Sequence, residues 1–227
     1  MDDRTPTPGG TARRIALTTL ATVLIALGIT LIGNGARSRT PPPQPGAAQA
    51  FGARSGARGA TGSPTPTAAP PPPLPPSAPT TVRIPAIHVA APMTGLGLER
   101  DGRLEAPPDG DRNLAGWYRD GTAPGAVGTA IVAGHVDTEQ GKAVFYDLGA
   151  LRRGATVEIG RADGRTAVFT VDAVEVYRAA AFPDREVYGN SARPELRLIT
   201  CGGGFDKKRQ EYEGNVVAYA HLTGTRP

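Results

Sequence analysis

Proline divides this chain into two parts with different folding potential. Of the 23 prolines in 227 residues, most lie before residue 80, in runs such as PPPQPG and TAAPPPPLPPSAP. Such runs favour extended polyproline II structure and cannot bury a hydrophobic core. We therefore predict a disordered Pro/Gly/Ala-rich linker over residues 34–79, with a reach on the order of 100 Å at ~3.1 Å per residue. The compact domain is predicted over residues 80–227, which is long enough for one core.

The N-terminal part holds one long apolar run. Residues 15–33, IALTTLATVLIALGITLIG, contain no charge and no proline, and roughly 20 apolar residues are enough to cross a bilayer. Arg13 and Arg14 precede the run, as the positive-inside rule expects of a cytoplasmic segment 1–14. We predict an uncleaved single-pass signal anchor in the cell membrane, with a cleaved signal peptide as the alternative. Both interpretations place the remainder of the chain outside the cytoplasm.

Residues 80–227 carry the pattern of short β-strands. Two alternating runs flank Ala162-Asp163-Gly164, which is a hairpin signature. Helical periodicity is poor, and only residues 143–154 offer a short helix or turn. The predicted strands are 81–89, 128–136, 155–161, 166–178, 195–201 and 215–222. Residues 80–227 are therefore expected to form an all-β barrel or sandwich of about seven or eight strands.

Charge and ligand spacing exclude two classes of partner. The net charge of +4 arises largely from arginines that are spread singly, so no nucleic-acid binding is expected. His135-x-Asp137 could belong to a metal site, but no second cluster has ligand spacing, and neither a metal nor another cofactor is expected. Asp137 is instead expected to cap its loop or to orient His135.

The single cysteine, Cys201, ends the run ELRLITC and is followed by three glycines. Glycines would let a substrate backbone approach and would leave N–H groups free for an oxyanion. A thiol nucleophile needs a base, because free cysteine is mostly protonated at neutral pH. His135, at the end of run 128–136, is the candidate base. The alternative is that Cys201 is a small structural residue.

The other candidate groups have simpler interpretations. His88 and His221 lie within strand-like runs and are expected to be structural. Arg209 lies on the connection between runs 195–201 and 215–222. Pairing of these runs would place Arg209 beside Cys201, where it could hold an oxyanion or a substrate carbonyl. The alternative is an ordinary surface arginine.

Two motifs carry a resemblance to a known family. LITC at residues 198–201, with GHVD about 65 residues upstream, resembles the signature of sortases. The stretches 115–137 and 194–206 are similar to class F sortases of actinobacteria. The resemblance covers residues 80–225 and implies an eight-stranded closed β-barrel with short helices. It also implies a cysteine transpeptidase on the outer face of a Gram-positive membrane.

The resemblance assigns roles to particular residues. It implies that Cys201 is the nucleophile and His135 the general acid/base, and that Thr200 and the backbone at Gly202 shape the oxyanion site. The loop 179–194, with Tyr188, corresponds to the segment over the sorting-signal groove. Family members commonly carry an arginine just before the final strand. Glu213 stands at that place here, so Arg209 is the nearest replacement.

The same resemblance implies the substrates. An LPxTG-like sorting signal would be cleaved between Thr and Gly through a thioacyl enzyme. An amine of a peptidoglycan precursor or of a pilin lysine would then resolve this intermediate. The alternative function is a non-catalytic surface β-domain that binds the cell wall or a protein partner. Other cell-wall cysteine enzymes fit less well. L,D-transpeptidases carry a His-Gly pair beside the cysteine, and NlpC-like peptidases have the cysteine before the histidine, whereas here His135 precedes Cys201.

Overall fold

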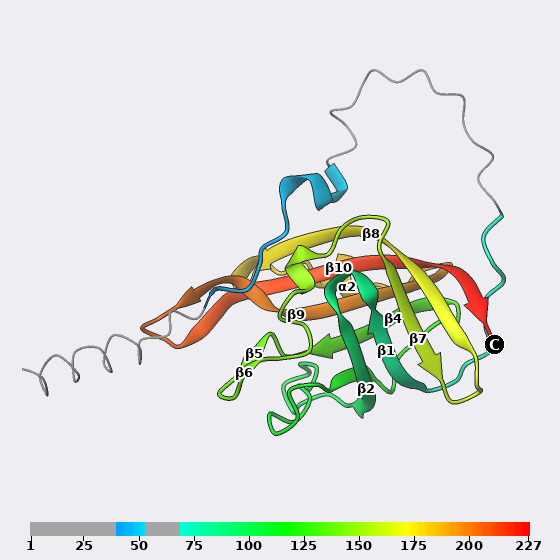
Figure 1. Cartoon of the computed structure of the whole chain (residues 1–227), viewed down its shortest axis with the longest axis horizontal. Helices are drawn as coiled ribbons and strands as arrows, with labels where there is room; N and C mark the ends of the chain where they lie inside the picture. The colour runs from blue at the N-terminus through cyan, green and yellow to red at the C-terminus, as the bar shows by residue number, and fades with distance from the viewer. Residues whose placement is uncertain (1–39, 53–68) are drawn as a thin grey trace, which may run out of the picture. The chain divides into compact units, whose positions relative to one another are not determined.

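The computed structural model describes residues 40–52 and 69–227 (Figure 1). The predicted anchor at 15–33 lies outside the described residues, and so does much of the predicted linker. In the described part of the chain, no helix is both long and apolar enough to cross a membrane. The prediction of an all-β, closed, eight-stranded barrel is confirmed.

The barrel closes in the order β1-β2-β3-β4-β9-β10-β8-β7, and β7 pairs back to β1. All neighbouring strands are antiparallel except the pairs β2/β3 and β4/β9, which are parallel. The strands are β1 (Pro79–Ile84), β2 (Val89–Leu96), β3 (Ala115–Tyr118), β4 (Gly128–Gly134), β7 (Thr156–Arg161), β8 (Thr166–Arg178), β9 (Pro194–Asp206) and β10 (Glu211–Arg226).

Short elements complete the domain. A two-stranded ribbon, β5 (Asp137–Thr138) and β6 (Gly141–Lys142), follows β4. The only α-helix in the part of the chain that the structure describes is α2 (Asp184–Tyr188). The 3-10 helices are η1 (Ala47–Gln49), η3 (Pro85–Ile87), η4 (Leu148–Ala150) and η5 (Ala179–Ala181).

Alternation of apolar residues fills the barrel. In β8, every second residue from Ala167 to Ala173 is buried, because successive side chains of a strand point to opposite faces. The interior is filled by large, fully buried side chains from β1, β7, β8 and β9 and from the segment around η4: Phe145, Phe169, Ile84, Leu148, Leu151, Ile159, Leu196 and Leu198. A second apolar cluster, which includes Ile131, Ile199 and Tyr219, lies on the other face of β4, β9 and β10.

The run 81–89 is two strands rather than one. Pro85 starts the turn η3, and His88 follows it with a left-handed φ of 56°. Ile84 therefore pairs with Val89 across an antiparallel connection. Proline cannot donate a ladder hydrogen bond, which explains why the chain turns at this position. His88 is a turn residue.

Residues 42–51, inside the predicted linker, contact the barrel. The ring of Phe51 packs edge-on against Tyr219 with centroids 4.9 Å apart, and its N–H donates to Glu175 at 2.8 Å. Arg153 donates from its backbone to Gln49 and from its side chain to Ala50, each at 2.8 Å. A part of the proline-rich segment thus binds the domain that follows it.

Arg161 holds a second piece of the predicted linker. Its fully buried guanidinium donates to the Pro75 carbonyl at 2.5 Å, to the Pro124 carbonyl, and to Asp163 at 2.9 Å. Hydrogen bonding by Arg161 lowers the pKa of Asp163, against the smaller opposing effect of burial. Residues before β1 are therefore fixed to the β7–β8 hairpin, which leaves less of the predicted linker as a free spacer.

Replacing Arg161 by methionine should lower the free energy of unfolding by about 3 kcal/mol, because breaking a buried charged network leaves its partners unsatisfied. For a domain of this size that corresponds to a melting temperature lower by about 10 °C. Thermal denaturation followed by circular dichroism measures it. Arg165→Met removes an exposed arginine of the same hairpin and is the matched control. An equal fall in melting temperature in both variants would contradict the stabilising role of the Arg161 network.

Candidate active site

His135 directly follows the end of β4, and Cys201 lies level with it on the neighbouring parallel strand β9. Cys201 was expected to end its strand, but β9 continues through the three glycines to Asp206. In the β4/β9 pair, Ala133 is the partner of Ile199, so both strands reach the same end of the barrel. The buried Thr200 hydroxyl donates to the Gly134 carbonyl at 2.8 Å and fixes the two strands together. His135 and Cys201 are the next residues along, and both line one pocket. The structure brings these two predicted residues together.

Glycine is required immediately before His135. A Cβ at Gly134 would lie 2.6 Å from side-chain carbons of Val144 and Phe145, which is too close for real atoms. The backbone of β4 can therefore lie directly against the segment before η4, where the Phe145 N–H donates to the His135 carbonyl at 3.0 Å. This packing fixes the position from which the imidazole projects.

The glycines after Cys201 form a β-bulge. Three residue steps on β9, from Gly202 to Phe205, face two steps on β10, from Gly214 to Tyr212. Gly203 and Gly204 accommodate the extra residue with positive φ values of 84° and 140°, which glycine adopts without strain. The Gly203 N–H donates to the Gln44 side chain at 3.1 Å. One of the N–H groups expected to be free is therefore occupied by the N-terminal segment.

The His135 ring is held by the β2–β3 loop. Its Nε2 lies 2.6 Å from the Pro107 carbonyl and 3.2 Å from the Asp109 carboxylate. A carbonyl oxygen only accepts hydrogen bonds, so Nε2 carries the proton in this arrangement. The side chain is 19% exposed, which leaves it accessible from the pocket.

The surroundings of Cys201 favour the protonated thiol. Part of the Cys201 residue is exposed to solvent. Its thiol is nevertheless partly buried, and this burial, followed by the nearby Asp137 carboxylate, raises the pKa of the thiol. Asp137 accepts a hydrogen bond from the Tyr212 hydroxyl at 2.7 Å. Burial and the contact with Asp137 raise the pKa of Tyr212 as well, so this hydroxyl stays a donor.

Alkylation of Cys201 by iodoacetamide should therefore be slow at neutral pH and should accelerate as pH rises through the elevated thiol pKa. Asp137→Asn removes the negative charge that disfavours the thiolate. It should lower the pKa and speed neutral-pH alkylation by about three- to tenfold. Mass spectrometry across a pH series gives both values. Asp147→Asn is the control, and a midpoint that moves upward in Asp137→Asn would contradict the prediction.

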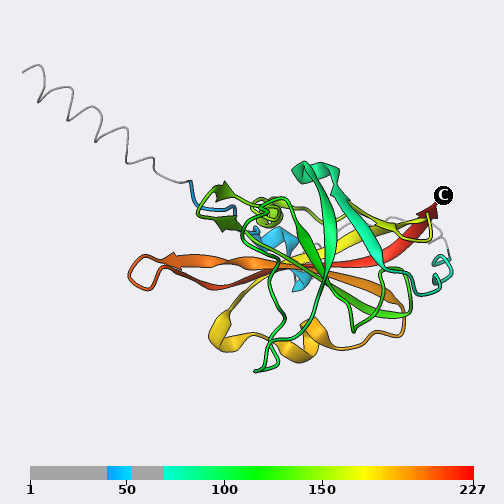
Figure 2. The same ribbon diagram turned by 90° about the horizontal axis from the view of Figure 1, so that it is seen from below.

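A groove with a volume of about 910 Å³ leads away from Cys201 and His135. Its floor includes Ile131 and Ile199 on the outer face of β4 and β9. One wall is the β2–β3 loop with Leu104, and the other is the β8–β9 connection with Phe182. Both connections flank the same side of the barrel in Figure 2. The groove is an apolar channel that ends at the thiol and the imidazole.

The remaining predicted site residues lie in different places. Tyr188, the last residue of α2, lines the groove and is 45% exposed, with its ring 5.7 Å from Phe182. Thr200 also lines the groove, with its hydroxyl already bonded to Gly134. Gly202 is buried against Val216, where a Cβ would meet the valine side chain at 2.7 Å.

The structure does not bring Arg209 to Cys201. The two strands pair as expected, but β9 continues to Asp206 and β10 begins at Glu211. The resulting ribbon projects from the barrel in Figure 1. Arg209 lies at its tip, 74% exposed and 3.2 Å from Glu211. Asp206 lies five residue steps beyond Cys201 along β9, which at ~3.3 Å each spans about 16 Å.

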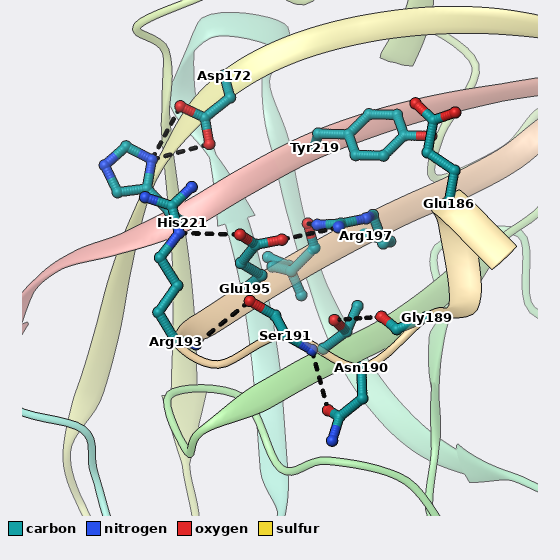
Figure 3. A network of polar contacts seen from close by, with 12 residues as sticks. Asp172, Glu186, Gly189, Asn190, Ser191, Arg193, Glu195, Arg197, Tyr219 and His221 are labelled. Carbon is teal, nitrogen blue, oxygen red and sulfur yellow. Dashed lines mark hydrogen bonds and ion pairs between the residues drawn. The ribbon is translucent and has the colours of Figure 1, made fainter.

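Arg197, which shares the cysteine's face of β9, is bonded elsewhere. Figure 3 shows its guanidinium beside Glu195, with a 2.7 Å ion pair, and it lies 4.5 Å from the Tyr219 ring centroid. Burial opposes ionisation of Glu195, but hydrogen bonds from Arg193 and Arg197 lower its pKa overall. His221, in the same network, bonds Asp172 at 2.8 Å. These charges stabilise the sheet and do not face Cys201.

Sequence reasoning missed two residues beside the thiol. Asn215 is the cross-strand partner of Cys201 and lines the groove. Tyr212 bonds Asp137, a contact between residues 75 apart in the chain. Asn215 could have been found by counting the β9/β10 pairing outward from the hairpin turn. The glycine bulge shifts this pairing by one residue, so the count from the sequence gives the wrong partner. In the described ranges 40–52 and 69–227, no group of ligands could hold a metal ion.

Several known proteins are similar to this chain. The Sortase domain family model matches residues 82–223. A lid mutant of sortase A from Corynebacterium diphtheriae is 17% identical over 66% of this chain and 72% of that chain, with a TM-score of 0.50. Sortase A from Listeria monocytogenes is 18% identical over 66% and 90%, with a TM-score of 0.48. Sortase C-1 from Actinomyces oris is 17% identical over 64% and 73%, with a TM-score of 0.49. No curated protein matches the sequence significantly.

Proposed function

The chain belongs to the sortase family, and on that premise we propose a membrane-anchored cysteine transpeptidase of the class F type. One observation carries the proposal: Cys201 and His135 lie together at one end of an apolar groove. Transpeptidation by a thiol needs this pairing, because the thiolate is the nucleophile and an imidazole can exchange its proton.

The acylation step follows from these positions. His135 takes the proton of Cys201, and the sulfur attacks the scissile carbonyl of a peptide lying in the groove. The C–N bond then breaks, the leaving amine takes the proton from His135, and a thioester on Cys201 remains. The raised thiol pKa means that few molecules hold a free thiolate at neutral pH. Proton transfer to His135 is therefore part of activation.

The groove suits an extended, partly apolar peptide. Its floor and walls present Ile131, Ile199, Leu104 and Phe182, which would bind the apolar start of an LPxTG-like signal. Thr200 and Tyr188 line the same groove and stay our predicted substrate contacts. We propose attachment through residues 15–33, with the barrel outside the cytoplasm, and an acceptor amine from a peptidoglycan precursor or a pilin lysine.

Incubation of the full chain, in detergent, with an LPxTG peptide tests this function. We expect an acyl adduct on Cys201 by mass spectrometry and, with an added amine, a ligated product. A peptide of the same composition in scrambled order is the control. Absence of any adduct from a folded protein, with both peptides behaving alike, would contradict the transpeptidase proposal.

A non-catalytic surface domain is the second candidate, and one observation favours it. Glu213 stands where family members commonly carry arginine, and Arg209 lies at the ribbon tip rather than beside Cys201. Loss of the group that holds the oxyanion would slow or abolish acyl transfer. Retained peptide binding without adduct formation would support this second function.

A further inference from the structure

A positioned carboxylate lies near Cys201 and is not among the residues that line the groove. Asp137 follows His135 by two residues and accepts a 2.7 Å hydrogen bond from the Tyr212 hydroxyl. Neither Asp137 nor Tyr212 lines the groove, which ends at Cys201, His135 and Asn215. Cys201 thus lines the groove and also has a polar pair, Asp137 and Tyr212, near it.

The polar pair is close to the sulfur. Tyr212 belongs to β10, and two and three residues further along that strand Gly214 and Asn215 are the partners of Gly202 and Cys201. The Asp137 carboxylate is near enough to raise the pKa of the thiol. Both side chains are partly exposed, so a ligand can reach them from solvent.

The charge on Asp137 has no cationic partner among the described residues. Lys142 is its cross-strand neighbour in the β5–β6 ribbon, but the Lys142 ammonium lies 4.2 Å from the centroid of the Tyr146 ring. Tyr146 is buried. Its pKa is raised mainly by this burial and less by the neighbouring carboxylates of Asp147 and Asp137. The Asp137 carboxylate is therefore oriented by one hydroxyl donor, Tyr212.

We propose that Asp137, oriented by Tyr212, binds the ammonium group of the incoming acceptor amine. This inference rests on the proposed transpeptidase function. In the thioacyl enzyme the acyl half of the signal would occupy the groove, and Asp137, which does not line the groove, would stay available to the acceptor. Aliphatic amines are mostly protonated at neutral pH, and a fixed carboxylate attracts and orients such a cation.

The protons balance in the resolving step. His135 is neutral after protonating the leaving amine, so it can accept one proton from the ammonium held at Asp137. The freed nitrogen attacks the thioester carbon, the C–N bond forms and the C–S bond breaks. The released thiolate takes the second proton of the nitrogen. The product amide leaves, Cys201 is again a thiol, and the protonated His135 returns one proton to solvent.

Thiol-directed probes test the ammonium site without any sorting signal. The full chain reacts with aminoethyl methanethiosulfonate, a cation, and with methyl methanethiosulfonate, which is neutral. The ratio of the two rate constants at Cys201 cancels the thiolate fraction and reports the local preference for a cation. Asp137→Asn should lower this ratio by about tenfold. Tyr212→Phe keeps the Asp137 carboxylate but removes the hydroxyl that orients it. This variant should lower the ratio by about threefold.

Asp147→Asn is the matched control for charge, because it removes a nearby carboxylate that has no bond to Tyr212; it should keep the wild-type ratio. Equal ratios in the wild type and Asp137→Asn would overturn the proposal. A fall of the same size in Asp147→Asn would also overturn it, because the effect would then be a general field and not a site.

Partitioning of the thioacyl enzyme tests the same site during transfer. With glycinamide, which is largely cationic at neutral pH, Asp137→Asn should lower the ratio of ligated to hydrolysed product by about tenfold. With hydroxylamine, a neutral nucleophile, the ratio should stay unchanged. An equal fall with both nucleophiles would contradict ammonium binding.

The two experiments separate the proposals. A cation preference that depends on Asp137, without release of the leaving peptide, would contradict the transpeptidase function and leave the ammonium site standing. Efficient transfer without any effect of Asp137→Asn would support the function and overturn the site.

Discussion

Cys201→Ala should reduce cleavage and transfer of an LPxTG peptide to the uncatalysed background, a loss of at least about 10⁴-fold. The chain has one cysteine, so no second thiol can form the thioester. Cys201 is exposed and follows a buried threonine, so its truncation leaves no cavity in the core. Release of the leaving peptide, measured by fluorescence, gives the rate.

The melting temperature of Cys201→Ala is the control for folding and should equal that of the wild type. Residual amine-dependent ligation in this variant would mean that another residue forms the covalent intermediate. It would remove the basis for assigning Cys201 as the nucleophile.

His135→Gln should lower the rate of acylation by about 10²- to 10⁴-fold, which is the usual contribution of a general acid/base. Glutamine retains an N–H donor for the Pro107 carbonyl, which accepts from His135 at 2.6 Å, but it cannot exchange a proton at neutral pH. The rate of the first release of leaving peptide in a rapid-mixing experiment isolates this step.

His221→Gln is the matched control, because His221 bonds Asp172 in the network of Figure 3 and lies outside the groove. We expect its rate to change less than about twofold, as for surface substitutions away from a site. Comparable losses in both variants would show that His135 acts through stability and not through proton transfer.

Local signals in the sequence predicted the strands whose pairing is itself local. The runs 155–161 and 166–178 became β7 and β8 with nearly the expected bounds, because Gly164 supplies the positive φ of 80° that the turn requires. The run 81–89 was predicted as one strand but forms two, with a tight turn at Pro85. The sequence alone does not show whether a proline bends a strand or ends it. The strand β3 was not predicted, because its four residues show no alternation of apolar and polar side chains.

The proximity of Cys201 and His135 was predictable from the sequence, and the residues around them were not. Strand-ending residues next to glycine indicated His135 and Cys201, and the parallel β4/β9 pair brings them to one pocket. Arg209 was expected beside the thiol because the hairpin was assumed to be short. The segment 202–212 has little apolar alternation, and its strand structure comes from pairing in the long β9–β10 ribbon. The contact of Tyr212 with Asp137 depends on that ribbon and on the path of β5.

The raised pKa of Cys201 also affects how readily this thiol is oxidised. Hydrogen peroxide and related oxidants attack the thiolate, and repeated oxidation leads to irreversible sulfinic and sulfonic acids. A solvent-exposed cysteine that is kept protonated by burial and by Asp137 offers little of that reactive form. By raising the pKa of Cys201, burial and the Asp137 carboxylate favour the form of this side chain that resists oxidation.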